Sequence, residues 1–377
     1  MKHFFVTGST GVVGSAVIRA LMQDPEVRAT LLIRAKDASE LAARLDELCQ
    51  FCELDPNARY RLEAVQGDAS LERFGMEKAS YANMASSCTH IIHSAGAVRM
   101  NLPIDKARAS AVGSARAVLQ LIRDCEAASG QRPKTELVST VGVGGRLPGT
   151  LPERWIREPR EFHNTYEQAK AEAEALVDAE GCRDLRITIH RPSMVVGDSR
   201  TGRNVHFQVF YHLAEFLSGR KTSGIHPGLG RCRLDVVPSD YVAQAIVWSA
   251  GQPPMAGEIL HLCSGPEGSV SLIDLQRVSR ERFGAWGLKL PPLVRIPIGL
   301  LRGLLPIMQF FASEKGKRAL GTLPVFLDYL ESDQGFGNPE STRTLEAAGI
   351  RRPAASEYLG VVLDAYLAAK YPRRAQV

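Results

Sequence analysis

The fold is set near the N-terminus by His3-Phe-Phe-Val-Thr-Gly-Ser-Thr-Gly-Val-Val-Gly14, followed by Ser15-Ala-Val-Ile-Arg-Ala-Leu-Met22. The stretch before the glycines has the length and composition of a buried strand, and the stretch after them has apolar residues at helical spacing. Strand, glycine-rich turn and helix in this order are typical of a dinucleotide site, because the helix N-terminus attracts the phosphates. Gly8 permits the tight turn, Gly11 lets the backbone approach the pyrophosphate, and Gly14 allows close helix packing. A plain strand–turn–helix connection is the alternative.

The end of the next expected strand indicates which dinucleotide binds. Arg28-Ala-Thr-Leu-Leu-Ile-Arg34 ends in a basic residue where an NAD enzyme usually carries an acidic one for the ribose 2′-hydroxyl. Arg34, Lys36 and Arg44 place positive charge near this point instead, which suits a 2′-phosphate. Lys36 is also explained as a solvated loop residue. The pattern favours NADP(H) over NAD(H).

A second pattern predicts carbonyl chemistry. Tyr166 and Lys170 lie four residues apart in a strongly helix-forming stretch, so they share one helical face. A neighbouring ammonium is expected to lower the pKa of the phenol, which is about 10 in a free tyrosine, toward a catalytic range. The expected strand before them ends in Ser139-Thr140, and either hydroxyl can donate to a carbonyl oxygen beside Tyr166. A helix cap or turn is the alternative for this pair of hydroxyls.

The order of apolar runs predicts an α/β fold. Strand-like runs recur near 28–33, 61–65, 89–94, 135–140 and 185–190, with helix-like stretches between them. This alternation is typical of a Rossmann-type doubly wound parallel sheet. We expect an NADP-binding domain over 1–198, to which 235–263 return. A smaller, mostly helical C-terminal substrate lobe is expected from 199–234 and 264–377, and the turn-rich stretch 145–162 is expected to rim the pocket.

Together these motifs make the chain similar to the extended short-chain dehydrogenase/reductases, and within them to the thioester reductase and fatty acyl-CoA reductase branch. The resemblance covers most of the chain. It rests on Val6-Thr-Gly-Ser-Thr-Gly-Val-Val-Gly14, Gln66-Gly-Asp68, His93-Ser-Ala-Gly96, Val138-Ser-Thr140, Asn164-Thr-Tyr-Glu-Gln-Ala-Lys170, Arg191-Pro-Ser-Met-Val-Val-Gly-Asp198, Val236-Val-Pro-Ser-Asp-Tyr-Val242 and the run from Phe326 through Phe336 to Ile350.

The resemblance implies roles for individual residues. Thr140, Tyr166 and Lys170 become a catalytic triad. The implied cofactor-binding residues are Gly8, Ser9, Thr10, Gly11, Val12, Val13, Gly14, Arg34, Arg44, Asp68, Ala69, Ser94, Ala95, Gly96, Tyr166, Lys170, Pro192, Ser193 and Val195. Asp68 is expected near the adenine, 94–96 along a ribose, 192–193 near the nicotinamide, and the two arginines at the 2′-phosphate. One position departs from the family, because Ser110 stands where an asparagine usually supports the active-site lysine.

Composition limits the function classes. The chain has 377 residues with 46 Lys and Arg against 41 Asp and Glu, a net charge of +5 without a concentrated basic run. This mild excess does not indicate nucleic acid, and it suits an acidic substrate such as a phosphopantetheine carrier. Cys49 and Cys52 lack a second ligand pair at zinc spacing, so no metal site is expected. Scattered cysteines and a first strand directly at the N-terminus predict a cytoplasmic protein without a signal peptide.

The stretch 291–311 is the most apolar part of the sequence. It contains Arg295, Arg302 and four prolines, so it does not meet the requirement of about 20 apolar residues for a membrane span. Three interpretations remain: a core helix of the lobe, a lid over an acyl chain, or a helix lying on a membrane surface.

From these features we expect an NADPH-dependent reductase that converts an acyl thioester, carried by CoA or an acyl-carrier protein, to an aldehyde. Further reduction of the aldehyde to the alcohol is left open. The enzyme is expected to act as a monomer or homodimer. A ketone or alcohol oxidoreductase and a nucleotide-sugar epimerase are the alternatives on the same fold, and Arg220, Lys221, Arg231 and Arg233 are candidates to bind a sugar-nucleotide diphosphate. A regulator that senses NADP(H) without turnover is a more remote alternative.

Overall fold

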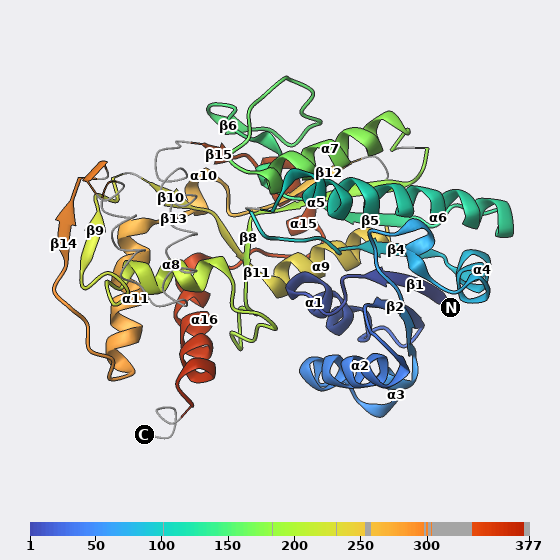
Figure 1. Ribbon diagram of the computed structural model, residues 1–377, viewed down its shortest axis with the longest axis horizontal. Coiled ribbons are helices and arrows are strands. Elements are labelled where there is room, and N and C mark those ends of the chain that lie inside the picture. The colour runs from blue at the N-terminus through green and yellow to red at the C-terminus, as the bar shows by residue number, and fades with distance from the viewer. Residues whose placement is uncertain are drawn as a thin grey trace.

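The computed structural model describes residues 1–100, 102–182, 184–230, 232–252, 258–297, 299–300, 303 and 334–372. A seven-stranded parallel sheet in the order β12-β7-β5-β4-β1-β2-β3 forms its centre (Figure 1). The strands are β1 (Lys2–Thr7), β2 (Val27–Ile33), β3 (Leu62–Gln66), β4 (His90–His93), β5 (Lys134–Val138), β7 (Ile187–Pro192) and β12 (Ile259–Leu262). The strand order reverses at β1, which confirms the predicted Rossmann-type doubly wound sheet.

Helices cover both faces of this sheet. One face carries α1 (Val12–Leu21), α2 (Ala38–Cys52) and α9 (Ser239–Ala250), and the other carries α4 (Lys78–Ser87), α6 (Ser114–Ser129) and α7 (Thr165–Ala179). Successive residues of a strand point to opposite faces, so Phe4 and Val6 join the first helical layer and Phe5 joins the second. The sheet is therefore buried on both sides, which explains why its strands read as continuous apolar runs.

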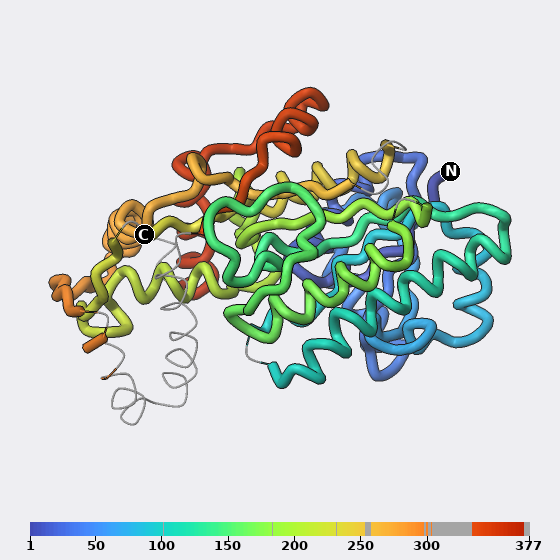
Figure 2. Tube along the Cα trace, turned by 90° about the horizontal axis from the view of Figure 1, so that it is seen from above, coloured from blue at the N-terminus to red at the C-terminus, as the bar shows by residue number. Residues whose placement is uncertain are grey.

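A third apolar cluster lies to one side of the sheet and is mostly helical (Figures 1 and 2). Its main elements are α8 (Val209–Leu217), α11 (Leu272–Ala285) and α16 (Ala355–Lys370), which bury Phe210, Leu213, Phe283 and Leu363 against one another. Short ribbons accompany these helices. They are formed by β9 (Ile225–Pro227) with β14 (Val294–Ile296) and by β10 (Arg233–Leu234) with β13 (Val270–Ser271).

The remaining elements connect the sheet to this cluster. They are α3 (Pro56–Tyr60), a 3-10 turn (Glu72–Gly75), α5 (Ile104–Arg108), a π-helical turn (Ala109–Gly113), a second 3-10 turn (Val141–Gly144), β6 (Thr150–Leu151), β8 (Met194–Val196), β11 (Val236–Pro238), α10 (Gly265–Gly268), β15 (Gly335–Phe336) and α15 (Pro339–Ala347). Although α15 comes late in the chain, its Leu345 lies in the core of the sheet layer with α1 and α9. The stretch 145–162 is fastened to the same region, because β6 pairs with β15.

The apolar stretch 291–311 lies largely outside the described residues, which include only 291–297, 299–300 and 303 of it. The three interpretations of this stretch, lipid contact among them, therefore fall largely outside what the structure describes. Within the described part of the chain, none of the helices has the length and apolar character needed to cross a membrane.

Candidate active site

The glycine turn has the backbone geometry that a dinucleotide site needs. Gly8 adopts a φ of +75°, and a Cβ there would lie 2.5 Å from the backbone nitrogen of Ala95. A Cβ on Gly14 would lie 2.0 Å from the carbonyl oxygen of Gly8. Neither position therefore tolerates a side chain, because the turn, the first turn of α1 and the end of β4 are in direct contact.

The start of α1 is available to an anion. Gly11 caps the helix without a side-chain hydrogen bond, so no side chain of the cap occupies the first N–H groups of the helix. The Ser9 Oγ is buried and finds no hydrogen-bond partner within the described residues. Beside the turn, Ser94 Oγ donates to the Thr7 carbonyl at 2.9 Å, which holds the loop after β4 against β1. The residues present thus fit a pyrophosphate group.

Two arginines meet at the end of β2, as the sequence predicts. The Arg44 guanidinium donates to the backbone carbonyl of Arg34. The Arg34 side chain is 77% exposed, and its Nη1 lies 3.9 Å from Asp68 Oδ2 at the end of β3. Burial of Asp68 opposes its ionisation, but hydrogen bonds from Ser70 and the charge of Arg34 hold its pKa below the usual value. Because the Arg34 side chain is this exposed and only loosely paired, it remains available to a phosphate.

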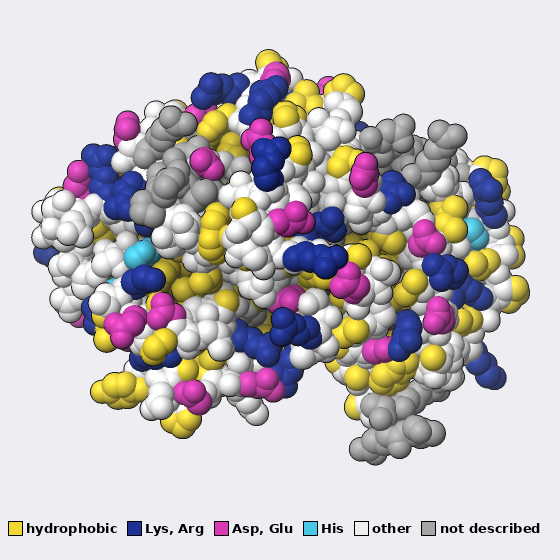
Figure 3. All heavy atoms as spheres, turned by 180° about the vertical axis from the view of Figure 1, so that it is seen from behind, with side chains coloured by type: hydrophobic (Ala, Val, Ile, Leu, Met, Phe, Trp, Pro, Cys, Tyr) yellow, Lys and Arg dark blue, Asp and Glu magenta, His cyan; other side chains and the backbone are white. Residues whose placement is uncertain are grey.

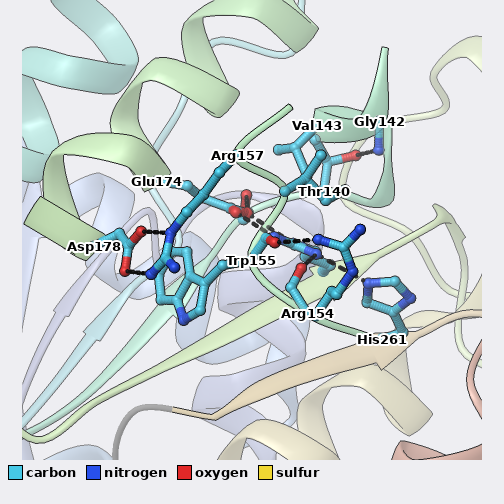
Figure 4. Close-up of polar contacts among 12 residues, drawn as sticks. Thr140, Gly142, Val143, Arg154, Trp155, Arg157, Glu174, Asp178 and His261 are labelled. Carbon is cyan, nitrogen blue, oxygen red and sulfur yellow. Dashed lines mark hydrogen bonds and ion pairs between the residues drawn. The ribbon is translucent and has the colours of Figure 1, made fainter. Parts of the chain in front are cut away.

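The structure separates the two hydroxyls at the end of β5. Ser139 is buried and its Oγ donates to the carboxylate of Glu174. Thr140 instead shares a side-chain hydrogen bond with Tyr166. Its Oγ1 also accepts from the Gly142 N–H at 3.2 Å and so caps the 3-10 turn that follows (Figure 4). Of the two candidates, Thr140 is the one beside the phenol.

The environment of Tyr166 corrects one expectation. Burial raises the pKa of Tyr166 to about 12, the hydrogen bond with Thr140 lowers it, and the nearby charge of Glu167 raises it. The expected lowering by Lys170 is wrong for this structure, because the ammonium is directed elsewhere: Nζ donates to the Val138 carbonyl at 2.9 Å. At neutral pH the phenol is therefore protonated and can donate a proton or a hydrogen bond.

Local sequence fixes where Tyr166 and Lys170 point. Asn164 begins α7 by accepting from the Glu167 N–H at 3.0 Å, which places Tyr166 in the first helical turn. Thr165 Oγ1 ties the same turn to the Leu102 carbonyl at 2.7 Å. Lys170 follows one turn later in the buried layer. Burial lowers its pKa to about 8, and the Glu174 carboxylate opposes this shift.

Lys170 also approaches the predicted ribose segment. A Cβ on Gly96 would lie 3.4 Å from Lys170 Nζ, so the absence of a side chain there leaves room for the ammonium. The buried His93 at the end of β4 bonds Thr7 Oγ1 through Nδ1 at 2.7 Å. Burial lowers its pKa to about 3, assisted by the charge of Lys170, so this imidazole is neutral.

Ser110 stands inside an irregular helical turn. Residues 109–113 form a π-helix between α5 and α6, and such turns often occur at functional sites. Ser110 Oγ accepts from the Ala97 N–H at 2.9 Å, while its carbonyl accepts from Ser114 Oγ at 2.6 Å. The short side chain thus fastens the loop after β4, whose Gly96 lies beside Lys170.

The last predicted cofactor segment follows β7. Ser193 N–H donates to the Leu262 carbonyl at 3.1 Å, which aligns the end of β7 with β12. Val195 then pairs with Val237 in the parallel ribbon of β8 and β11. Pro192 and Ser193 therefore lie at the carboxyl edge of the sheet, where Thr7 ends β1 and where Asp68, Ser94 and Thr140 follow their strands. This edge is where open α/β sheets bind ligands.

A buried charged network lies beneath these residues, and it was not predicted from the sequence. Glu174 accepts from Arg191 Nε at 3.0 Å and from Nη2 at 2.6 Å. Arg191 Nη1 continues to the Arg154 carbonyl at 2.9 Å and to His261 Nε2 at 3.2 Å (Figure 4 shows Glu174, Arg154 and His261 gathered together). A signal was present: Glu174 stands four residues after Lys170 on the same helical face.

Two other groups of residues serve in packing. Arg220 Nη1 donates to the Tyr371 hydroxyl at 2.9 Å, Lys221 lies 3.4 Å from the buried Glu215, and Arg233 Nε donates to Ser269 Oγ at 2.9 Å. These three candidates for binding a sugar-nucleotide diphosphate are thus engaged in contacts at the third cluster, and residue 231 is outside the described part. Cys49 and Cys52 are buried on α2, and no group of three or more potential metal ligands occurs within the described ranges.

The chain is similar in sequence to proteins of known name. The chain is 26% identical over 282 residues to an L-2-aminoadipate reductase of Schizosaccharomyces pombe. This alignment covers 70% of this chain and 19% of that protein. It is 26% identical over 337 residues to an isonitrile lipopeptide synthase of Streptomyces coeruleorubidus, covering 87% of this chain and 21% of that protein. The chain thus spans about a fifth of the length of these relatives.

A solved structure matches over nearly the whole chain. It is the terminal R domain from the myxalamid PKS-NRPS biosynthetic pathway, with 25% identity, a TM-score of 0.80, and coverage of 98% of this chain and 91% of that one. The model of the NAD-binding family described as male sterility protein matches residues 6–246, more than half of the chain. The family match confirms the expected NAD(P)-binding domain of the extended short-chain type, and the chain belongs to the male sterility protein family of NAD-binding domains.

Proposed function

We propose that the protein is an NADPH-dependent reductase that converts an acyl thioester to an aldehyde. The observation that carries this proposal is the position of Tyr166 beside Thr140 at the carboxyl edge of the sheet, one helical turn from Lys170, where burial raises the pKa of the phenol. Two hydroxyl donors at this edge suit a substrate whose carbonyl oxygen gains negative charge. The names of the relatives, which include a reductase and a lipopeptide synthase, support a substrate held as a thioester.

We propose that the cofactor lies along the carboxyl edge. The glycine turn and the start of α1 would hold the pyrophosphate, Asp68 and Ala69 would lie beside the adenine, and Arg34 with Arg44 would bind the 2′-phosphate. Residues 94–96 would follow the ribose, and 192–193 with Val195 would border the nicotinamide. When bound, NADPH supplies the hydride.

The chain's own residues would perform the remaining steps. Thr140 and Tyr166 would donate hydrogen bonds to the carbonyl oxygen and stabilise the oxyanion as it forms. Tyr166, whose pKa is about 12, would then give its proton to that oxygen. Lys170 would bind the ribose hydroxyls near Gly96. Collapse of the hemithioacetal breaks the carbon–sulfur bond and gives the aldehyde and a thiol, and the alcohol would require a second hydride.

We propose that the two expected parts of the chain bind different molecules. Residues 1–198 with 235–263 would bind the cofactor, and 199–234 with 264–377 would bind the acyl group, except that α15 packs with the sheet. Lys/Arg and Asp/Glu side chains are interspersed on the face shown in Figure 3, a pattern that suits a protein or CoA thioester better than nucleic acid. Seven free cysteines fit the reducing cytoplasm, where we place a monomer or homodimer.

The proposal is tested by incubating the protein with NADPH and each of four substrate classes in turn. These are acyl-CoAs from C4 to C16, the same acyl groups on a carrier protein, ketones, and sugar nucleotides. Loss of nicotinamide absorbance and trapping of the aldehyde report turnover. We expect turnover of thioesters only. Because each buried methylene contributes about 0.8 kcal/mol, kcat/KM should climb several-fold for each added pair of carbons and then level off. Turnover of ketones or sugar nucleotides in place of thioesters would refute the proposal, and a flat chain-length profile would refute an apolar acyl site.

A further inference from the structure

The carboxylate of Glu174 is used by none of the proposed chemical steps, yet it lies directly beneath the site residues. The residue is 4% exposed, and both of its oxygens accept hydrogen bonds. Arg191, which is 1% exposed, binds both oxygens through Nε and Nη2, and Ser139 Oγ donates to one of them. A buried ion pair with this bidentate geometry fixes the relative positions of the segments that carry it.

Three segments that carry proposed site residues meet at this carboxylate. Ser139 precedes Thr140 at the end of β5, and Arg191 precedes Pro192 at the end of β7. Glu174 itself lies on α7, one turn after Lys170 and two turns after Tyr166, so the three share one helical face. A shift of Glu174 would therefore change the distances between Thr140, Tyr166 and the nicotinamide segment together.

The contacts of Arg191 extend this arrangement to the loop at the rim. Its Nη1 donates to the Arg154 carbonyl at 2.9 Å and to His261 Nε2 at 3.2 Å. His261 Nδ1 donates in turn to the Gly337 carbonyl at 2.7 Å, next to β15. Burial and the charge of Arg191 lower the pKa of His261 to about 3, so the imidazole is neutral and accepts from Arg191.

The groups that surround the Lys170 ammonium show how the Glu174 carboxylate affects the protonation of this lysine. The Val138 carbonyl faces it from β5 at 2.9 Å, the neutral His93 faces it from β4, and Gly96 lies beside it. The helical turns at 104–113 also pack on α7, where Arg108 is paired with Glu172 on the exposed side. Glu174 is the group whose negative charge favours the protonated ammonium against burial.

We propose that Glu174, held by Arg191, is a positioning residue that aligns Thr140, Tyr166 and Lys170 and keeps Lys170 cationic for cofactor binding. The inference rests on the proposed role of Lys170 in binding the ribose, but it does not depend on which carbonyl substrate is reduced. Its test can therefore use binding of NADPH alone.

The experiment measures the dissociation constant of NADPH against pH from 6 to 10 for the native protein, Glu174→Gln and Arg191→Gln. In the native protein, binding should weaken as pH rises through the Lys170 pKa of about 8. Glu174→Gln removes the negative charge, so this weakening should begin about half a pH unit or more lower. Arg191→Gln leaves the negative charge in place, so the weakening should stay where it is or move to higher pH.

The two partners of one ion pair thus have different predicted effects, which a purely structural role does not give. Glu136→Gln is the matched control, because it also removes a buried carboxylate from an ion pair on β5, but its side chain faces α9, on the opposite face of the sheet from α7 and Lys170. It should leave the pH profile unchanged. If Glu174→Gln does not fold, Glu174→Gln/Arg191→Gln, which has no unpaired buried charge, takes its place with the same expected direction.

An unchanged profile in Glu174→Gln, or an equal downward shift in Arg191→Gln, would overturn the inference. Failure of the thioester proposal is separate from both outcomes, because it would appear in substrate turnover and not in NADPH binding. In Glu174→Gln, kcat should also fall at the pH where Lys170 is fully protonated, by roughly tenfold, because misalignment of Thr140 and Tyr166 remains after the charge is restored.

Discussion

Two buried carboxylates, Glu136 on the sheet and Glu174 on α7, differ in what lies beside them. Glu136 lies in the middle of β5, where it pairs with Lys134 at 2.6 Å, His190 at 2.6 Å and Ser249 at 2.8 Å. Glu174 lies at the carboxyl edge, where it pairs with Arg191 and Ser139. Both are almost inaccessible to water, at 0% and 4% exposure. Glu136 binds side chains in the middle of the strands and on α9, whereas Glu174 binds Ser139 and Arg191, which directly precede the proposed site residues Thr140 and Pro192.

The difference shows that burial of charge alone does not indicate function. Burial of Glu136 opposes its ionisation, yet hydrogen bonds and charges from His190 and Lys134 hold the pKa of this carboxyl below its usual value. The cluster therefore satisfies itself within the strands and α9. At the carboxyl edge of a parallel sheet the same kind of pair lies beside the ligand crevice, so it can act on reacting groups.

The largest expected effect is a loss of unfolding free energy when the Glu136 cluster is disrupted. Glu136→Gln leaves Lys134 buried with weaker compensation, and breaking a buried pair in this way costs about 3–5 kcal/mol of unfolding free energy. Chemical denaturation should show this loss, while kcat/KM under conditions where the variant is folded should stay within about twofold of the native value. A variant with normal stability would contradict the assignment of this cluster to the fold.

The next prediction tests whether the cluster of Glu174, Arg191 and Ser139 lies beside a catalytic phenol. Tyr166→Phe removes the proton donor but keeps the ring, so turnover should fall by roughly 10²-fold or more while NADPH still binds. Tyr81→Phe is the matched control, because Tyr81 also carries a buried hydroxyl, bonded to Asp124 at 2.7 Å, away from this edge. Stopped-flow or steady-state absorbance measures both variants. Near-normal turnover in Tyr166→Phe would remove the triad and, with it, the reason to set Glu174 apart from Glu136.

The parts of the site that sequence could predict are those that local spacing determines. The glycine turn, the arginine at the end of β2 and the Tyr166–Lys170 pair each depend on residues within one strand, turn or helix. The strands predicted near 28–33, 61–65, 89–94, 135–140 and 185–190 correspond to β2, β3, β4, β5 and β7 for the same reason. Continuous apolar runs are what a sheet covered on both faces requires.

The rest depends on contacts between segments far apart in the chain. Glu174 and Arg191 are 17 positions apart and Arg191 and His261 are 70, so no local pattern joins them. Strand and helix spacing left Ser139 and Thr140 both open, although the family resemblance implied Thr140. The position of Glu174 explains the difference, because it binds one hydroxyl and leaves the other to Tyr166. The pKa of Tyr166 was misjudged because helical spacing places Lys170 nearby without showing that its ammonium turns to the Val138 carbonyl.

The smallest expected effect extends the comparison to an exposed charge. Arg34 is 77% exposed and only 3.9 Å from Asp68, so Arg34→Ala should leave the unfolding free energy nearly unchanged, unlike either buried carboxylate. Its charge-assisted hydrogen bonds to a 2′-phosphate would still be lost, which should weaken NADPH binding about tenfold and leave NADH binding nearly as it was. Lys36→Ala, another exposed cation two residues away, is the control and should change neither. Fluorescence titration with both cofactors, alongside thermal unfolding, measures the contrast. Equal losses for NADPH and NADH would make Arg34 a structural residue, whereas a loss confined to NADPH would show that an exposed charge at this edge acts only when its ligand is bound.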